Sequence, residues 1–170
     1  EWVKENIADF GGDPNQVFVV AKSAAAAHAA TYVFRPDLLD AGTVMATGVI
    51  MVSGTYDADT TRAGQNRIDY FGEDLSRWPE ISTIGNVSNV ETPVMFTVSE
   101  FDLNSSLVGT AALINEYAEK SGQLPRFVQL MRHNHYSPNP SIGTQDTQLS
   151  ASILQFVSSV IGGQELLTAR

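Results

Sequence analysis

Short runs of apolar, β-favouring residues recur along the chain at intervals that leave room for helices. The four runs cover residues 17–20, 49–52, 94–98 and 127–130. A continuous, mainly apolar run of this length is typical of a strand that is buried on both faces, as in a parallel sheet. The pattern therefore predicts about four parallel strands.

Helical patterns fill most of the intervals between these runs. Val3, Ile7 and Phe10 form one apolar stripe, which predicts a helix over residues 1–10 that ends at the Gly-Gly-Asp-Pro of residues 11–14. Three further helices are predicted, over residues 24–33, 107–120 and 146–161. Strands that alternate with helices form right-handed βαβ units, so the predicted fold class is α/β.

Composition narrows the class of protein. With 170 residues and 43% hydrophobic content, the chain can bury one core, and nothing indicates a second independent domain. The net charge of −9 and the scattered Lys and Arg argue against a nucleic acid or an anionic membrane as partner. The absence of Cys excludes disulfides and thiolate metal sites, and no apolar run approaches the ~20 residues of a membrane span. We expect a soluble protein, whose compartment the sequence leaves open.

Candidate catalytic residues follow three of the predicted strands. Ser23 follows the first strand, Asp102 the third, and His133 and His135 the fourth. Because the carboxyl ends of parallel strands meet at one edge of a sheet, we expect these side chains to gather there. The residue types are those of a nucleophile, an acid and a base.

Ser23 lies where the first strand turns directly into the Ala-rich helix. Such a turn lifts the side chain out of the sheet and brings the next backbone N–H, that of Ala24, to a helix N-terminus that can stabilise an oxyanion. The tight turn needs small residues two positions before and after the serine; Ala21 and Ala25 stand where Gly is usual. The alternative is that Ser23 serves only as the N-cap of the helix.

The other candidates leave alternatives open. Asp102 can be a loop carboxylate, and Glu100 is the second choice for the acid. The spacing of His133 and His135 suits a metal, but the neighbouring sequence lacks the further Cys, Asp or Glu ligands of a zinc site, so we expect no metal. His28, in the Ala-rich helix, is expected to be a packed, hydrogen-bonded helix residue. A nucleotide-binding domain is disfavoured because no G-x-G-x-x-G or P-loop opens a helix.

The sequence resembles α/β-hydrolases of the carboxylesterase/lipase superfamily over nearly its whole length. Residues 2–14 resemble the helix and turn before the nucleophile strand, and residues 15–25 that strand and its elbow. Residues 92–102 resemble the strand and loop of the catalytic acid, and 133–137 the loop in which the base is the second His. Two segments resemble the post-strand and cap segments of small microbial esterases, including feruloyl-esterase-like and kynurenine-formamidase-like proteins: residues 54–57 and 70–74.

The resemblance implies one α/β-hydrolase domain, of which residues 1–170 are the C-terminal portion with a cap-like insertion at 55–90. The N-terminal strands and the Gly-rich oxyanion loop of the family do not precede the helical pattern at residue 1. We therefore expect an N-terminal half, from the same protein or another chain, to complete the sheet and to be required for activity.

The implied function is hydrolysis of small or aryl carboxylic esters through an acyl-enzyme, without metal or organic cofactor. Ser23 would attack the carbonyl, His135 would move the proton, Asp102 would orient His135, and Ala24 N–H would donate to the oxyanion. The alternative function is a non-catalytic, hydrolase-like binding module or an inactive fragment without the oxyanion loop.

Overall fold

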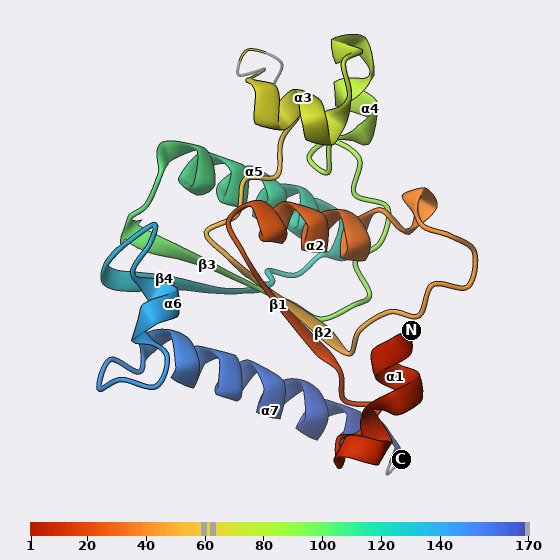
Figure 1. The fold of residues 1–170 in the computed structure, drawn as a ribbon. Coiled ribbons are helices and arrows are strands. Elements are labelled where there is room, and N and C mark those ends of the chain that lie inside the picture. Colours follow the sequence, from red (N-terminus) through yellow and green to blue (C-terminus); the bar gives the residue numbers. More distant parts are fainter. Residues whose placement is uncertain (59–60, 62–63, 169–170) are drawn as a thin grey trace.

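Four parallel strands form the centre of the computed structural model, which describes residues 1–58, 61 and 64–168. The strands lie in the order β1 (Phe18–Lys22), β2 (Gly48–Val52), β3 (Val94–Phe101) and β4 (Arg126–Asn134) (Figure 1). Neighbouring strands are thus consecutive in sequence, and each connection crosses over through the segment between them. The predicted α/β class and the four parallel strands are confirmed.

Helices cover both faces of this sheet (Figure 1). Helices α2 (Ala24–Phe34) and α5 (Asn104–Ser121) lie on one face, and α7 (Gln148–Thr168) lies on the other. Side chains along β2 alternate between the two resulting cores: Val49 and Met51 pack on the α2 side, and Ile50 and Val52 pack on the α7 side. This double burial explains why the strand is a continuous apolar run.

The remaining helices are short. The first predicted helix divides into α1 (Trp2–Asn6) and a 3-10 turn, η1 (Ile7–Phe10), which ends at Gly11 with a φ of 80°. The other short elements are η2 (Pro36–Leu38), α3 (Gln65–Phe71), η4 (Leu75–Arg77), α4 (Trp78–Ile81) and α6 (Pro138–Ser141). None of the helices in the described part of the chain is long and apolar enough to cross a membrane.

The segment between β2 and β3 rises over α2 and α5 (Figure 1). Its helices α3 and α4 pack around Trp78, whose side chain is fully buried and whose Nε1 donates to the Gly72 carbonyl at 2.9 Å. The sequence also predicts short helical stretches near residues 62–71 and around Trp78, and helical structure is present there, although residues 62 and 63 lie outside the described residues. Residues of α3 thereby come to line a cavity with Ser23, the residue that follows β1.

Two strands extend beyond their apolar runs. β3 continues to Phe101 and β4 to Asn134, and Phe101 pairs with Asn134 after a register shift. Glu100 and His133 therefore lie in strands, which corrects their expected placement in loops. The prediction failed there because the backbone ladder continues through polar residues, whereas the pattern of apolar side chains stops earlier.

Candidate active site

Ser23, Asp102 and His135 meet at the carboxyl ends of β1, β3 and β4. The Oγ of Ser23 lies 2.9 Å from Nε2 of His135, and Nδ1 of the same ring lies 2.8 Å from Oδ1 of Asp102. The His135 and Asp102 side chains are almost wholly buried. The structure thus brings together the three residues that the sequence singles out, in the connected order that a Ser-His-Asp arrangement needs.

The backbone at Ser23 is strained. Its φ of 55° and ψ of −122° lie outside the usual regions for a residue with a side chain. The conformation is held by the sheet and the helix, because Ser23 N–H donates to the Val52 carbonyl at 2.8 Å and Ala26 N–H donates to the Ser23 carbonyl at 3.0 Å. The hydroxyl makes no capping bond to α2 and contacts His135 instead, so a role as a side-chain N-cap alone is wrong.

The two alanines beside this turn have different surroundings. Ala21 is buried in the core on the α2 side of the sheet, whereas Ala25 is exposed on the first turn of α2. The methyl groups therefore occupy places where this backbone accommodates them. Ala24, the first residue of α2, lines the cavity beside Ser23, and its N–H is among the four that an α-helix leaves without an intrahelical acceptor.

Four donors surround the Asp102 carboxylate. Oδ1 accepts from His135 and from Leu103 N–H at 2.8 Å, and Oδ2 accepts from Ser53 Oγ at 2.5 Å and Ser99 N–H at 2.9 Å. Burial raises the pKa of Asp102, but the hydrogen bonds, of which that from Ser53 is the strongest, hold the pKa below its ordinary value. The carboxylate is therefore kept ionised.

Ser53 is the part of this site that sequence reasoning missed. It is completely buried at the end of β2 and has a φ of 53°, so two adjacent strands end in strained serines. Its N–H donates to the Thr97 carbonyl at 2.9 Å, and its carbonyl accepts from Ser106 Oγ at 3.2 Å. The available signal was its position, since Ser53 follows a buried strand at the same sheet edge as Ser23.

Removing the Ser53 hydroxyl is expected to lower the folding stability of the protein at acid pH. A hydrogen bond to a buried charged group contributes about 1.5–3 kcal/mol, and the lowered pKa of Asp102 adds stability at neutral pH that is lost as pH falls through the folded-state pKa. In Ser53→Ala this pKa rises, so the contribution is lost at higher pH. Acid unfolding followed by circular dichroism should show a higher midpoint pH, whereas Ser158→Ala, on the exposed side of α7, should leave it unchanged.

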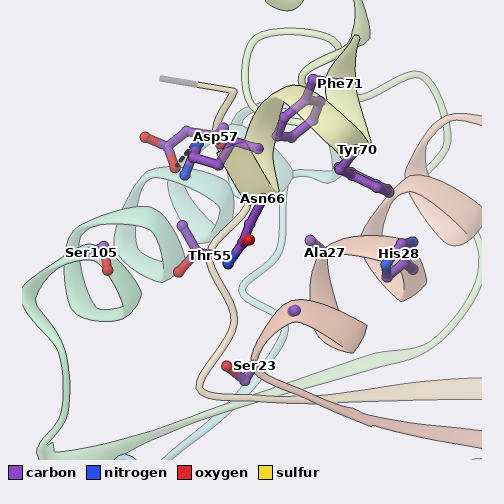
Figure 2. Close-up of a pocket in the computed structure, with 11 residues that line it drawn as sticks. Ser23, Ala27, His28, Thr55, Asp57, Asn66, Tyr70, Phe71 and Ser105 are labelled. Atoms are coloured by element: carbon purple, nitrogen blue, oxygen red, sulfur yellow. Dashed lines mark hydrogen bonds and ion pairs between the residues drawn. The ribbon is translucent and has the colours of Figure 1, made fainter. Parts of the chain in front are cut away.

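A cavity of about 460 Å³ opens beside Ser23 (Figure 2). Its floor is the start of α2, with Ala24 and Ala27, and its opposite wall is α3, from which the Asn66 side chain points into the space above Ser23. The remaining lining residues are His28, Thr55, Asp57, Arg67, Tyr70, Phe71 and Ser105. The volume is in the range of small-molecule sites.

The other sequence candidates lie outside the Ser23–His135–Asp102 contact. Glu100 Oε2 accepts from Arg132 N–H at 2.6 Å, and His133 contacts Ser137 and Asp146. His28 is exposed, and its ring meets that of Tyr70 edge-on with the two ring centroids 4.4 Å apart. The expectation of a packed, hydrogen-bonded helix residue is therefore wrong for His28. Within the described ranges no group of three or more His, Cys, Asp or Glu is placed to hold a metal ion.

The chain resembles known esterases in sequence over part of its length and in fold over nearly all of it. The model of the carboxylesterase family matches residues 1–76, which is less than half of the chain. No curated protein matches the sequence. The expected likeness to carboxylesterases is thus confirmed for the segment that contains Ser23.

Solved structures extend the likeness to the whole fold. The thermophilic esterase Est2 of Thermogutta terrifontis is 18% identical, with a TM-score of 0.61 over 93% of this chain and 58% of that one. The acetyl ester-xyloside bifunctional hydrolase of Caldicellulosiruptor lactoaceticus is 15% identical, with a TM-score of 0.69 over 92% and 61%. The Francisella virulence factor BioJ is 13% identical, with a TM-score of 0.60 over 95% and 57%. The chain therefore has their fold and spans about three fifths of their length.

Proposed function

We propose that this chain, whose residues 1–76 match the carboxylesterase family and whose fold is that of known esterases, hydrolyses carboxylic esters with Ser23, His135 and Asp102 as its catalytic residues. The observation that carries the proposal is the continuous contact from Ser23 Oγ through both ring nitrogens of His135 to Asp102. Hydroxyl, imidazole and carboxylate in this order form the device that activates a serine for acyl transfer.

The proton movements follow from these contacts. Asp102 accepts a hydrogen bond from His135 Nδ1–H, which leaves Nε2 unprotonated and able to accept the proton of Ser23. Ser23 Oγ attacks the ester carbonyl, and the oxyanion faces Ala24 N–H at the start of α2. His135 then gives the proton to the departing alkoxide. Water then attacks the acyl carbonyl while His135 takes its proton, and His135 returns that proton to Ser23 Oγ as the carboxylic acid departs. The proposed reaction uses no metal or organic cofactor.

The cavity favours esters with a small or aryl uncharged group. Tyr70 and Phe71 supply aromatic surface opposite the small side chains of α2. The two opposite charges of the wall offset each other, because Arg67 Nη2 donates to the Asp57 carbonyl at 2.5 Å and lies 3.9 Å from its carboxylate. A cavity with aromatic walls and paired charges binds a neutral group better than an ion.

Ala27→Leu tests whether this cavity binds the substrate. The larger side chain fills the floor beside Ser23, so kcat/KM for aryl esters should fall about 10- to 100-fold while that for the smallest acetate esters changes less. Hydrolysis rates for a series of nitrophenyl and alkyl acetates, propionates and benzoates measure this. Ala111→Leu is the matched control, since Ala111 is exposed on α5 away from Ser23. Equal losses for all esters would contradict the assignment of the cavity.

The proposal includes a partner for the edge of the sheet. β1 is an edge strand, and Trp2, Phe10 and Val20 expose 63%, 74% and 51% of their surface beside or near it. An open strand edge with exposed apolar side chains favours pairing. We propose that an N-terminal half, from the same protein or another chain, covers this edge and supplies oxyanion donors besides Ala24. Rapid backbone hydrogen exchange along β1 in the active protein would contradict this.

A fluorophosphonate probe tests the proposed function. The probe reacts with an activated serine, so we expect one covalent adduct, on Ser23, that mass spectrometry of the digested protein locates. Ser23→Ala should abolish the adduct, and Ser158→Ala should leave it intact. A folded protein that takes up no probe would overturn the proposal and favour the alternative, a hydrolase-like module that binds without catalysis.

A further inference from the structure

The first histidine of the His-Asn-His segment is buried although it lies outside the Ser23–His135–Asp102 contact. His133 exposes only 4% of its surface and meets a polar side chain at each ring nitrogen. Nδ1 lies 2.9 Å from Ser137 Oγ, and Nε2 lies 3.0 Å from Oδ2 of Asp146. The second contact is close enough for a charge interaction but is not aligned as a hydrogen bond.

The loop that carries His135 is built around Ser137. Asn134 Oδ1 accepts from the backbone N–H groups of Tyr136 and Ser137, at 2.9 and 3.1 Å, and Asn134 N–H donates to Ser137 Oγ at 3.1 Å. Residues 134–137 therefore close on themselves, with His135 inside the turn. Ser137 Oγ also lies 2.9 Å from His133 Nδ1 and 3.5 Å from the Asn134 carbonyl. The shorter of these two contacts ties the turn to the end of β4.

The other side of His133 is also fixed. Asp146 Oδ1 accepts from Gln148 N–H at 3.2 Å at the start of α7, and the Gln148 amide pairs with both the N–H and the carbonyl of Met131, at 2.8 and 3.1 Å. The Asp146 carboxylate favours a proton on Nε2, which leaves Nδ1 to accept from the Ser137 hydroxyl. Ser137 Oγ can then accept from Asn134 and donate to His133 at once.

We propose that His133 is a positioning residue, which holds the loop of His135 in register with Ser23 through its bond to Ser137. The inference rests on the proposed function, in which His135 is the base. An imidazole suits the position because its two nitrogens face partners on opposite sides of the ring. A displacement of His135 of about 1 Å is enough to lower the rate of a positioned proton transfer by up to ~100-fold.

Two substitutions of His133 separate its two contacts. The side-chain amide of Asn reaches about as far as Nδ1, so His133→Asn can keep the bond to Ser137, whereas the longer Gln reaches the place of Nε2 and loses it. We expect kcat for ester hydrolysis to fall about 10- to 100-fold in His133→Gln with little change in KM, and to stay within about 2-fold of the wild type in His133→Asn. Ser137→Ala should match His133→Gln, and the double variant should fall no further.

Asp146→Asn is the matched control at the solvent side of the ring. The Asp146 side chain is 41% exposed, and the amide oxygen of Asn can still accept from His133 Nε2–H and so keep the same tautomer, so this change should alter kcat by less than about 2-fold. Should His133→Gln fail to fold, Ser137→Ala removes the same bond by deleting one hydroxyl. Wild-type kcat in both His133→Gln and Ser137→Ala, or an equal loss in His133→Asn, would overturn the proposal.

A proton NMR measurement separates this proposal from the proposed function. The ring N–H of His135 that is bonded to Asp102 gives a downfield resonance that reports the geometry of that pair without any turnover. We expect the resonance to shift or broaden in His133→Gln and Ser137→Ala and to persist in His133→Asn. If it does so in a protein without esterase activity, the positioning role stands and the proposed function fails; an unchanged resonance in an active protein overturns the positioning role.

Discussion

Ser23→Ala and His135→Ala are each expected to lower kcat for ester hydrolysis by on the order of 10⁶-fold, and the double variant by no more. The two side chains act as one unit, since the 2.9 Å contact between Ser23 Oγ and His135 Nε2 is the path of the proton. With either member absent the other has no role in the attack. Substrate binding in the cavity and the Ala24 N–H donor would remain, so the residual rate should still exceed that of uncatalysed ester hydrolysis in water.

Single-turnover kinetics with an activated aryl ester measure the loss of rate in the Ser23 and His135 variants. The KM of Ala27→Leu is a check on binding in the cavity. Ser158→Ala and Ala111→Leu provide the unaffected references, because both residues are exposed on helices away from the site. Losses that add in the double variant would show that Ser23 and His135 act in separate steps, and the roles assigned to them would then be wrong.

The positions of Ser23 and Asp102 were predictable because they depend only on where the parallel strands of the sheet end. A buried apolar run predicts a strand, parallel strands bring their carboxyl ends together, and Ser23 and Asp102 each follow such a run. The choice of His135 over His133 depended on resemblance, because both residues stand at the same end of β4. The backbone turn at residues 134–137, which decides between the two rings, leaves no apolar pattern in the sequence.

Ser53 was unpredictable for a related reason. Ser53 can contact Asp102 only because the ends of β2 and β3 are aligned along the sheet, and the register of these two strands sets that alignment. The sequence predicts the two strands but not their register to within one residue, and a slip of one residue turns a side chain to the other face. A polar residue after a strand is therefore a candidate whose partner only the structure identifies.

Backbone strain gathers at this end of the sheet. Among the described residues, those other than glycine with a positive φ are Ser23, Ser53 and Arg132. Ser23 and Ser53 directly follow β1 and β2, and Arg132 lies within β4, two residues before its end. Such conformations cost of order 1–3 kcal/mol each and persist where the surroundings hold them, most often at functional sites. Here the strained backbone turns Ser23 toward His135 and brings Ser53 Oγ to Asp102, so two of the three strained residues aim or support a member of the site.

Asp102→Asn is expected to lower kcat by about 10⁴-fold, as is typical when the acid of such a triad becomes an amide. The neighbours of this carboxylate explain why an amide cannot replace it. Leu103 N–H points at Oδ1 and Ser99 N–H at Oδ2, so an NH₂ group at either position meets a backbone donor. An NH₂ group on the Oδ1 side would also reverse the tautomer of His135, placing the proton on Nε2 where Ser23 needs an acceptor.

The same substitution is expected to lower the melting temperature, because the amide NH₂ opposes the N–H of either Ser99 or Leu103 and that donor loses its acceptor. The cost is about 1–3 kcal/mol where the donor is buried, as on the Ser99 side. Kinetics and thermal unfolding of one preparation measure both effects. Glu100→Gln is the matched control: Glu100 lies two residues earlier and accepts only the N–H of Arg132 among the described contacts, so its kcat should stay within a few-fold of the wild type. A large loss in Glu100→Gln with a small one in Asp102→Asn would assign the acid to Glu100, against the 2.8 Å bond between Asp102 and His135 on which the assignment rests.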